Sequence, residues 1–334
     1  MRNNRDLIAI TGGCGFIGAN LANHLANQGF RIVVIDSMEP VYNPSLVLLR
    51  KQMLQLNSNI NVIQMDLNKT SPSDLRKILL GCSSIFHFAA FPGVHQSALY
   101  PETYLQNNVN SFSRILSIAM DLEIERFFFA SSSSVYGETP EMQPIAEDTA
   151  NGSNLKSFYA QTKWSNELMA RDFVQKLGFP IIALRFFTVF GPWGRPDMSY
   201  WRFAQDLELN KPISLFGADG GIRNFTYIND VVNILEKLLT VKFDPSFHAI
   251  NIASGNPVSA KFLALLIAKE MHIDSPIFEN FEKKPFDVSF TWADLSILKN
   301  IIGSTPEPHL GLGIRNFVQW YLNQNSKIRH GLDG

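Results

Sequence analysis

A tyrosine and a lysine four positions apart, Tyr159 and Lys163, carry the clearest signal for acid–base chemistry in this sequence. On a helix the two side chains lie on one face, so a phenol and an ammonium group can point into the same pocket. At about 4 Å and an effective dielectric constant of about 20, their attraction is worth roughly 4 kcal/mol. One pKa unit corresponds to about 1.36 kcal/mol, so the lysine is expected to lower the pKa of the phenol from about 10 towards about 7. The pair would then work as a base at neutral pH, although the same spacing also occurs in ordinary pairs on helix surfaces.

The chain upstream of this pair contains the pattern of a dinucleotide-binding unit. Residues 7–10 form an apolar run typical of a buried strand, the glycine-rich segment 11–18 follows, and residues 19–27 are expected to form a helix. A second strand is expected over residues 31–36 and ends in Asp36. In such units the glycines let the backbone approach a pyrophosphate at the N-terminus of the helix. Asp36 is expected to bind the ribose hydroxyls and to repel a 2′-phosphate, so NAD is favoured over NADP.

The later apolar segments predict an α/β fold, a Rossmann-like doubly wound parallel sheet with a smaller C-terminal substrate-binding lobe. Ligands of such sheets bind beyond the carboxyl ends of the strands. Further strands, separated by helical stretches, are expected over residues 61–66, 84–90, 126–131 and 181–186. The alternation ends after residue 190. We therefore expect a NAD-binding domain over residues 1–190 with a return strand at 249–253, and a second lobe over residues 191–248 and 257–334.

Composition and charge exclude several functional classes. The chain has 29 basic and 30 acidic residues and a formal net charge of −1, without a basic block of the kind that binds nucleic acid or a membrane surface. Its two cysteines are too few for a disulfide framework or a zinc site, so we expect no metal and a reducing compartment. The apolar run at residues 7–10 is too short for a signal peptide or a spanning helix, which predicts a cytoplasmic protein.

Five motifs, taken in their order, resemble those of the extended short-chain dehydrogenase/reductase family, and in particular its NAD-dependent nucleotide-sugar epimerases and dehydratases. The resemblance covers nearly the whole chain and rests on residues 11–18, 87–90, 131–137, 159–163 and 223–230. It implies that Tyr159 is the base that takes a proton from a sugar hydroxyl. It also implies that Lys163 binds the nicotinamide ribose and that Ser132 hydrogen-bonds the same sugar hydroxyl.

The resemblance further implies two sets of binding residues around this catalytic set. Asp66 and Leu67 are expected to flank the adenine, Ala89 and Ala90 the pyrophosphate, and Asn108 the region between cofactor and substrate. The set expected to bind NAD is Gly12, Gly15, Phe16, Ile17, Gly18, Asp36, Asp66, Leu67, Ala89, Ala90, Asn108, Tyr159 and Lys163. A UDP-sugar is expected to be bound by Pro92, His95, Ser133, Ser134, Thr188, Arg195, Arg223 and Lys284. Among these residues, Arg223 is expected to pair with the diphosphate.

Two features favour epimerisation at C4 of the sugar. Family members that eliminate water carry an Asp-Glu pair after the catalytic Ser/Thr, whereas this chain has Ser133 and Ser134 at those positions. The segment 185–198 is similar to the UDP-glucuronate 4-epimerases, in which the residues matching Thr188 and Arg195 hold the C6 carboxylate of the sugar. A fixed guanidinium group suits that role. We therefore expect conversion of UDP-glucuronate to UDP-galacturonate through a 4-keto intermediate, in the setting of polysaccharide synthesis.

Two departures from the family pattern leave other interpretations open. His95 stands where the family usually has arginine, and the segment around Lys284 differs from the usual Gln-Pro-Gly-Asp-Val. The alternatives are a 4-epimerase of UDP-glucose or of a UDP-N-acetylhexosamine, a nucleotide-sugar dehydratase, and a non-catalytic NAD-sensing protein on the same fold. By resemblance, the protein is also expected to form a homodimer through the helices that follow the fourth and fifth strands.

Overall fold

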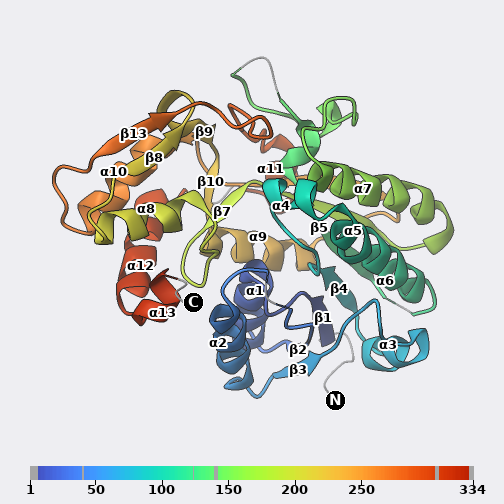
Figure 1. Cartoon of the computed structure of the whole chain (residues 1–334). Helices are drawn as coiled ribbons and strands as arrows, with labels where there is room; N and C mark the ends of the chain where they lie inside the picture. The colour runs from blue at the N-terminus through green and yellow to red at the C-terminus, as the bar shows by residue number, and fades with distance from the viewer. Residues whose placement is uncertain (1–6, 40, 123, 139–141, 305–307, 331–334) are drawn as a thin grey trace.

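A seven-stranded parallel sheet forms the centre of the molecule, with the strand order β11-β6-β5-β4-β1-β2-β3 (Figure 1). The computed structural model describes residues 7–39, 41–122, 124–138, 142–304 and 308–330. The strands of the sheet are β1 Leu7–Thr11, β2 Arg31–Asp36, β3 Ile60–Gln64, β4 Ser84–His87, β5 Arg126–Ser132, β6 Ile181–Phe186 and β11 Phe247–Ile252. Every neighbouring pair in this sheet is parallel. The predicted doubly wound parallel sheet is therefore confirmed, and its strand order reverses between β1 and β4, where ligands of such sheets bind.

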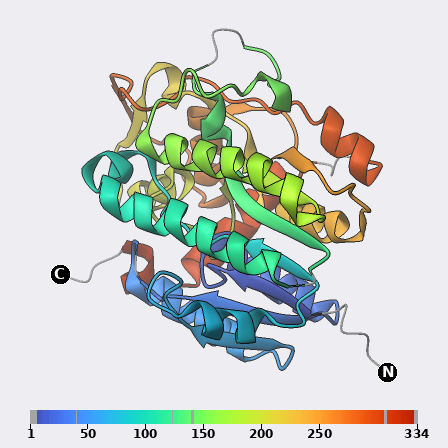
Figure 2. The ribbon, with the colours of Figure 1, turned by 90° about the vertical axis from the view of Figure 1, so that its right-hand side faces the viewer.

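Helices cover both faces of the sheet (Figures 1 and 2). Ile8 and Ile10 of β1 pack against one group of helices and Ala9 packs against the other, because alternate residues of a strand point to opposite faces. The first group contains α1 Phe16–Asn27, α2 Pro44–Gln55, α9 Ile228–Thr240 and α11 Ser296–Ile302. The second contains α3 Pro72–Leu79, α6 Ser111–Met120 and α7 Phe158–Leu177. Within the described ranges, none of these or the other helices is long and apolar enough to cross a membrane.

The first helix begins at Phe16, three residues before the start expected from the sequence, so that Gly18 lies inside it. A side chain at Gly18 would place its Cβ 2.4 Å from the carbonyl oxygen of Gly12. Gly12 itself has φ +66°, and a Cβ there would meet the backbone of Ala89 at 2.5 Å. The glycines therefore allow the first turn of α1 to pack directly on the loop after β1 and on the end of β4.

Short segments at the carboxyl ends of the strands connect the sheet to its helices. The chain between β4 and α6 forms α4 Val94–Leu99, α5 Pro101–Tyr104 and the π-helix η2 Leu105–Asn110. The chain between β5 and α7 contains the 3₁₀-helices η3 Ser133–Tyr136 and η4 Glu147–Thr149. These connections bring residues that follow β4 and β5 to the same edge of the sheet.

The C-terminal lobe consists of small sheets and helices on the left of Figure 1. Its strand pairs are β7 Thr188–Phe190 with β10 Phe225–Tyr227, β8 Ile213–Phe216 with β13 Phe278–Phe281, and β9 Ile222–Arg223 with β12 Val258–Ser259. Its helices are α8 Ser199–Glu208, the 3₁₀-helix η5 Ala218–Gly220, α10 Ala260–Glu270, α12 Leu310–Leu322 and α13 Ser326–His330. Trp201 of α8 packs on Phe317, Trp320 and Tyr321 of α12, so aromatic contacts hold these two helices together.

Candidate active site

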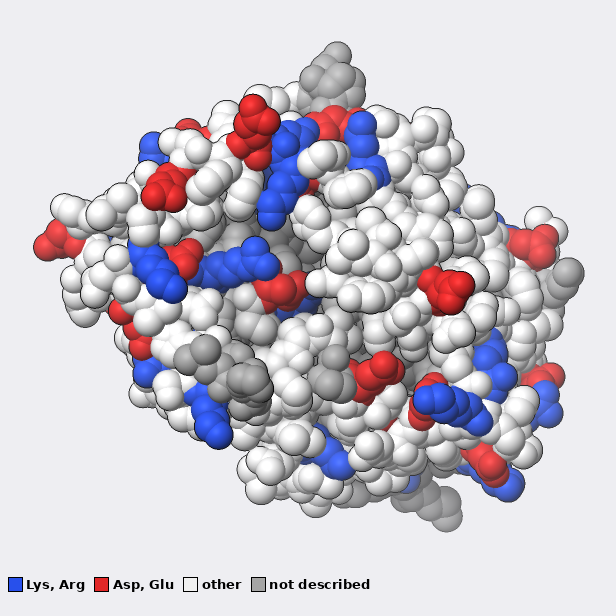
Figure 3. All heavy atoms as spheres, in the orientation of Figure 1, with Lys and Arg blue, Asp and Glu red and all other residues white. Residues whose placement is uncertain are grey.

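A cavity of about 1440 Å³ lies at the carboxyl ends of the central strands and extends into the C-terminal lobe. Figure 3 shows the molecule hollowed between its two parts, with charged side chains along the rim of the hollow. Pockets for a single small molecule usually measure roughly 300–1000 Å³, so this cavity has room for a dinucleotide and a second ligand. On the side of the C-terminal lobe its charged lining residues are Arg195, Asp197, Arg202, Asp206, Arg223, Lys283, Lys284 and Asp287.

The inner wall of the cavity is formed by the glycine-rich loop and the tip of β2. The predicted cofactor residues Gly12, Gly15, Phe16, Ile17 and Gly18 all line it. Asp36 lines it as well, and its carboxylate accepts hydrogen bonds from the backbone N–H groups of Cys14 and Met38, each at 2.9 Å. Burial raises the pKa of Asp36, and these two hydrogen bonds and the charge of Arg50 act in the opposite direction. The backbone thus fixes the carboxylate at the position where a ribose is expected.

The next part of the wall contains residues that follow β3 and β4. Asp66, Leu67, Ala89 and Ala90 line the cavity. Asn108 lies behind this wall: it is 1% exposed, its Oδ1 accepts from the backbone N–H of Phe91 at 2.7 Å, and its Nδ2 donates to the carbonyl of Phe91 at 3.0 Å. The structure therefore places Asn108, which belongs to the π-helix η2, as a brace of the cavity wall rather than on its surface.

Ser132, Tyr159 and Lys163 meet at the centre of the cavity. The side chain of Ser157 accepts a hydrogen bond from the backbone of Ala160 and so caps α7, which places Tyr159 in the first turn of that helix. The Nζ atom of Lys163 lies 5.7 Å from the centre of the Tyr159 ring and donates to the carbonyl oxygen of Ala130 at 2.8 Å. The three residues come from the end of β5 and from one face of α7, as the four-residue spacing predicts.

The pKa values of this pair differ from the direction expected from the sequence. Burial raises the pKa of Tyr159, while the Arg195 guanidinium and a hydrogen bond from Ser132 lower it. Burial also lowers the pKa of Lys163 to about 7. The expectation that Lys163 depresses the pKa of the phenol is therefore wrong for the protein alone. Desolvation of both groups outweighs their mutual attraction, and the nearby cation that favours the phenolate is Arg195.

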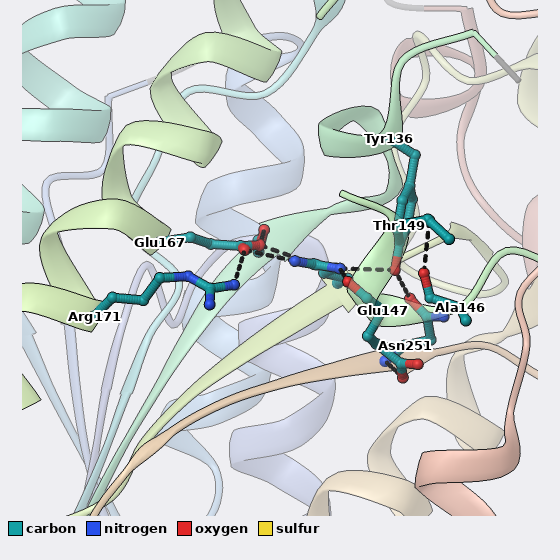
Figure 4. A network of polar contacts seen from close by, with 9 residues as sticks. Tyr136, Ala146, Glu147, Thr149, Glu167, Arg171 and Asn251 are labelled. Atoms are coloured by element: carbon teal, nitrogen blue, oxygen red, sulfur yellow. Dashed lines mark hydrogen bonds and ion pairs between the residues drawn. The ribbon is translucent and has the colours of Figure 1, made fainter. Parts of the chain in front are cut away.

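A buried ionic network supports this centre from behind (Figure 4). Glu167 of α7 accepts hydrogen bonds from Arg185 at 2.7 and 2.9 Å and from the hydroxyl of Ser131 at 2.6 Å. Arg185 also donates to the Tyr136 hydroxyl at 2.9 Å, and Tyr136 donates to Asn251 at 2.5 Å. Arg185 and Glu167 are both completely buried. The network joins β5, β6, β11 and α7, and it fixes the strand that ends in Ser132 against the helix of Tyr159 and Lys163.

The far end of the cavity contains the residues predicted to hold the sugar. Ser133, Ser134, Thr188 and Arg195 line it. The guanidinium of Arg195 forms a two-pronged ion pair with Asp197, with Nε to Oδ1 at 3.0 Å and Nη2 to Oδ2 at 2.6 Å. Burial alone would raise the pKa of Asp197, but the charge of Arg195 holds it below its usual value. Arg195 therefore already has an anionic partner inside the cavity.

The outer wall is formed by residues of the C-terminal lobe together with α4. Arg223 lines it and donates to the backbone carbonyls of Ile222 and Val288 at 3.0 and 2.5 Å. Lys284 lines the same cavity, and the Nζ atom of Lys284 lies 4.2 Å from the centre of the Phe216 ring. On the opposite side, Pro92 and His95 line the cavity, and His95 lies edge-on to Phe286 at 5.9 Å between ring centres. The two departures from the family pattern, at His95 and around Lys284, thus meet across the mouth of the cavity.

Comparisons with known proteins agree with this arrangement. The model of the NAD dependent epimerase/dehydratase family matches residues 8–253 of the chain. The chain belongs to this family. It is 32% identical to UDP-glucuronate 4-epimerase 4 of Arabidopsis thaliana, over 97% of this chain and 77% of the relative, and 32% identical to the UDP-glucuronate 4-epimerase of Thermodesulfobacterium geofontis, over 93% and 94%.

The same agreement extends to three dimensions. The crystal structure of UDP-glucuronic acid 4-epimerase from Bacillus cereus in complex with UDP-glucuronic acid and NAD matches 94% of this chain and 98% of its own, with a TM-score of 0.87 and 30% identity. Membership of the NAD dependent epimerase/dehydratase family makes the chain an enzyme, with NAD as its cofactor and nucleotide-sugar epimerase/dehydratase chemistry as its activity.

The residues of the cavity fit the family's cofactor. No side chain caps the first turn of α1 at Gly15, so backbone N–H groups at the start of this helix are available to a pyrophosphate. The close contacts of Gly12 and Gly18 hold that turn against the loop after β1 and the end of β4. Within the described residues, no group of three or more His, Cys, Asp or Glu side chains is placed to hold a metal ion.

Two residues that line the cavity were not among the site residues predicted from the sequence. Asp197 follows Arg195 by two positions, and that spacing on a loop is a usable signal for an ion pair. Lys283 also lines the cavity, where its Nζ donates to Glu138 at 2.9 Å and to Ser289 at 2.6 Å. No local sequence pattern predicts the contact of Lys283 with Glu138, because the two residues are 145 positions apart in the chain.

Proposed function

We propose that the enzyme catalyses the NAD-dependent 4-epimerisation of a UDP-sugar, with UDP-glucuronate and UDP-galacturonate as the pair interconverted. The observation that carries this proposal is the position of Arg195, whose guanidinium lies in the same cavity as Tyr159 and whose charge opposes the rise that burial causes in the pKa of the phenol. A cation next to the catalytic base suits a sugar that bears a carboxylate. The printed names of the A. thaliana, T. geofontis and B. cereus relatives support the same substrate.

The chemistry at C4 follows from the residues at the centre. Tyr159, as the phenolate, takes the proton from the O4 hydroxyl, and Ser132 hydrogen-bonds the same oxygen. NAD, held by the start of α1, Asp36 and Lys163, would supply reversible hydride transfer at C4, so that the 4-keto sugar, once turned, regains its hydride on the other face. Tyr159 then gives the proton back to O4, so the cycle consumes neither proton nor hydride. Arg195 keeps the sugar carboxylate ionised and paired, which opposes loss of carbon dioxide from the 4-keto acid.

The ion pair of Arg195 with Asp197 implies an exchange of partners when an acidic sugar binds. Two carboxylates on one guanidinium repel each other, so the sugar either shares Arg195 or displaces Asp197. Arg202 also lines the cavity, and its charge is among those that lower the pKa of Asp197. Arg202 therefore offers Asp197 a second cationic partner while the sugar occupies Arg195.

The same ion pair favours a second candidate substrate, a neutral UDP-sugar such as UDP-glucose or a UDP-N-acetylhexosamine. If Asp197 keeps Arg195, the charge of that arginine is already neutralised, and by resemblance His95 stands at a position that is usually arginine in the family. Elimination of water is disfavoured, because Ser133 and Ser134 supply hydroxyls where a dehydratase would need an acid and a base. A non-catalytic NAD sensor is disfavoured because Ser132, Tyr159 and Lys163 lie together in the cavity.

The decisive experiment is incubation of the purified holoenzyme with UDP-glucuronate, without added NAD, followed by chromatographic separation of the products. The proposal expects UDP-galacturonate, and it expects Arg195→Ala to weaken turnover of the acidic sugar by about ten- to a hundredfold while sparing UDP-glucose. If the unaltered enzyme converts UDP-glucose but not UDP-glucuronate, the substrate is a neutral UDP-sugar and the proposal of UDP-glucuronate is wrong.

A homodimer through α6 and α7 is part of the same proposal. The two helices lie side by side on the face turned to the viewer in Figure 2. Leu168 of α7 is 49% exposed, and Leu105 at the start of η2 is 46% exposed. Four apolar side chains of two subunits would be removed from water by such a contact. Light scattering of the purified enzyme, compared with Leu168→Glu, tests this arrangement.

A further inference from the structure

Arg50 of α2 is a completely buried arginine that neither the proposed reaction nor the sequence motifs involve. Its guanidinium has five N–H groups, and all five are engaged. Nε donates to the carbonyl of Trp193 at 3.0 Å, Nη2 donates to the carbonyls of Trp193 and Gly194 at 2.7 Å each, and Nη1 donates to the Tyr42 hydroxyl at 2.9 Å and to the Cys14 carbonyl at 3.4 Å.

These acceptors belong to the two functional halves of the cavity. Cys14 lies in the glycine-rich loop, and its own N–H donates to Asp36, the residue expected at the cofactor ribose. Trp193 and Gly194 lie directly before Arg195, the residue proposed to hold the sugar carboxylate. Arg50 therefore links the loop at the cofactor to the loop at the sugar through backbone atoms, and Trp193 lies 143 positions after it in the sequence.

The loop that Arg50 contacts has a conformation that needs support. Trp193 has φ +62°, which is unfavourable for a residue with a bulky side chain. Its carbonyl accepts two hydrogen bonds from Arg50, and the N–H of Arg195 donates to the hydroxyl of Tyr200 at 3.1 Å. The peptide groups on both sides of Gly194 are thus held, one from α2 and the other from α8.

The charge of Arg50 also has no carboxylate partner among the ion pairs of the described residues, since its acceptors are carbonyls and a phenol. A buried guanidinium that makes no ion pair is costly unless its donors are satisfied, and here they are. The carboxylate of Asp36 also lies close enough to interact with the charge of Arg50. A lysine in its place has three donors on one atom and cannot reach carbonyls of two separate loops and Tyr42 together. The site therefore requires an arginine and not merely a positive charge.

We propose that Arg50 is a positioning residue for sugar recognition: it holds the Trp193–Gly194 backbone so that Arg195 faces the sugar, and it couples this loop to the cofactor loop. The part that concerns an acidic sugar rests on the proposed function. Arg50 acts through Arg195 and does not touch the substrate. Its loss therefore weakens recognition of the sugar carboxylate and leaves recognition of the UDP moiety unchanged.

The test measures binding of UDP-glucuronate and of UDP alone to the NAD-loaded enzyme by calorimetry. Arg50→Lys is expected to raise the dissociation constant of UDP-glucuronate by at least about tenfold and to leave that of UDP unchanged. In the Arg195→Ala background the same substitution should have no further effect on UDP-glucuronate. An equal effect on UDP, or an undiminished effect in the Arg195→Ala background, overturns the proposal.

Arg114→Lys is the matched control. Arg114 also clamps backbone carbonyls, those of Leu67 and Thr70, but on the adenine side of the cavity. Its replacement is expected to lower thermal stability without changing the ratio of the two dissociation constants. If Arg50→Lys fails to fold, Tyr42→Phe removes one of the acceptors of Arg50, and it should change the same ratio in the same direction by about two- to fivefold. An unchanged ratio in Tyr42→Phe then overturns the proposal.

A second measurement tests the role of Arg50 independently of which sugar the enzyme accepts. The chain has five tryptophans, and labelling with 5-fluorotryptophan gives each of them a ¹⁹F resonance. The resonance of Trp193 is assigned as the one that is absent from the spectrum of Trp193→Phe. Arg50→Lys is expected to shift or broaden the Trp193 resonance in the NAD-loaded enzyme, whereas Arg114→Lys should not. If wild-type enzyme does not bind UDP-glucuronate, the proposed function fails while this resonance still tests Arg50. An unchanged Trp193 resonance in Arg50→Lys overturns the positioning role.

Discussion

The cofactor half and the sugar half of the cavity are built in different ways. In the cofactor half the key contacts are made by backbone atoms. Gly12 packs on the backbone of Ala89 and Gly18 packs on Gly12. The carboxylate of Asp36 accepts hydrogen bonds from backbone N–H groups. In the sugar half, Arg195 and His95 come from segments separated by 100 residues, and each depends on contacts made by other side chains.

This difference bears on the two places, His95 and the segment around Lys284, where the sequence is expected to depart from the family pattern. A backbone cradle works only with glycine and one geometry, so the cofactor half keeps the family pattern. A wall of side chains can be rebuilt when two partners change together, and His95 and Phe286 are in contact across the mouth of the cavity. The cofactor half thus determines the type of chemistry, and the sugar half determines which sugar is presented to it.

The largest expected effect comes from Tyr159→Phe, which breaks the centre that both halves share. Turnover should fall by about 10²- to 10⁴-fold, because Tyr159 is the group proposed to take the O4 proton. Binding of NAD and of the UDP-sugar should change little, since the ring remains. Initial rates with the accepted UDP-sugar, together with calorimetric binding constants, measure both effects.

Tyr100→Phe provides the control for this substitution, because the Tyr100 side chain is 59% exposed. Equal loss of turnover in both variants would show that the phenol of Tyr159 has no special role. Full activity in Tyr159→Phe would show that a group other than the Tyr159 phenol takes the O4 proton.

The next largest effect concerns the buried ion pair of Glu167 and Arg185, which lies behind the catalytic residues. Glu167→Gln should lower the free energy of unfolding by about 3–5 kcal/mol, because it leaves the buried Arg185 without its carboxylate. Denaturant unfolding measures this, and Glu270→Gln is the control, since Glu270 pairs with the exposed Arg315 and should cost only about 0–1 kcal/mol. Similar values for the two variants would show that the network stores no more stability than a surface ion pair.

A pH experiment examines Lys163, which belongs to the shared centre. Burial lowers its pKa in the folded protein to about 7 from a usual value of 10.5. Between these values the unfolded chain binds more protons than the folded one, so the free energy of unfolding should rise with pH. In the NAD-free protein we expect an increase of roughly 2 kcal/mol from about pH 7 to about pH 9.

Lys163→Met removes the group that causes this slope. The variant should show a flatter profile over the same pH window and greater stability than wild type at neutral pH, together with loss of activity. Parallel profiles of the two proteins in urea unfolding would show that the lysine is not desolvated in the absence of NAD.

Much of the fold and of the cofactor half follows from local sequence. Apolar runs and the glycine segment specify the seven strands of the sheet and the loop after β1, because each feature lies within about ten residues of chain. The expected helix start was late because Gly18 reads as a loop residue, whereas its contact with Gly12 places it inside α1. That contact is a matter of packing and leaves no periodic signal.

The unpredicted parts of the site depend on contacts over long distances in the sequence. Glu167 and Arg185 look like ordinary charged residues until the fold buries them together. Arg50 carries no motif, since its acceptors are backbone carbonyls of any residue type. The direction of the Tyr159 pKa was misjudged because the spacing to Lys163 gives the attraction between the two groups but not the cost of their desolvation.

The smallest effect, and the one that separates the two halves most directly, is expected from Asp197→Asn. Without the carboxylate, Arg195 has no competing anion, so the dissociation constant of UDP-glucuronate should fall by about two- to tenfold. A neutral UDP-sugar and NAD should bind as before, because neither depends on the charge of Arg195. Calorimetry on the NAD-loaded variant measures all three ligands. Weaker binding of the acidic sugar would instead mean that Asp197 orients Arg195 for its substrate, and the ion pair would then be part of the recognition site rather than a competitor for it.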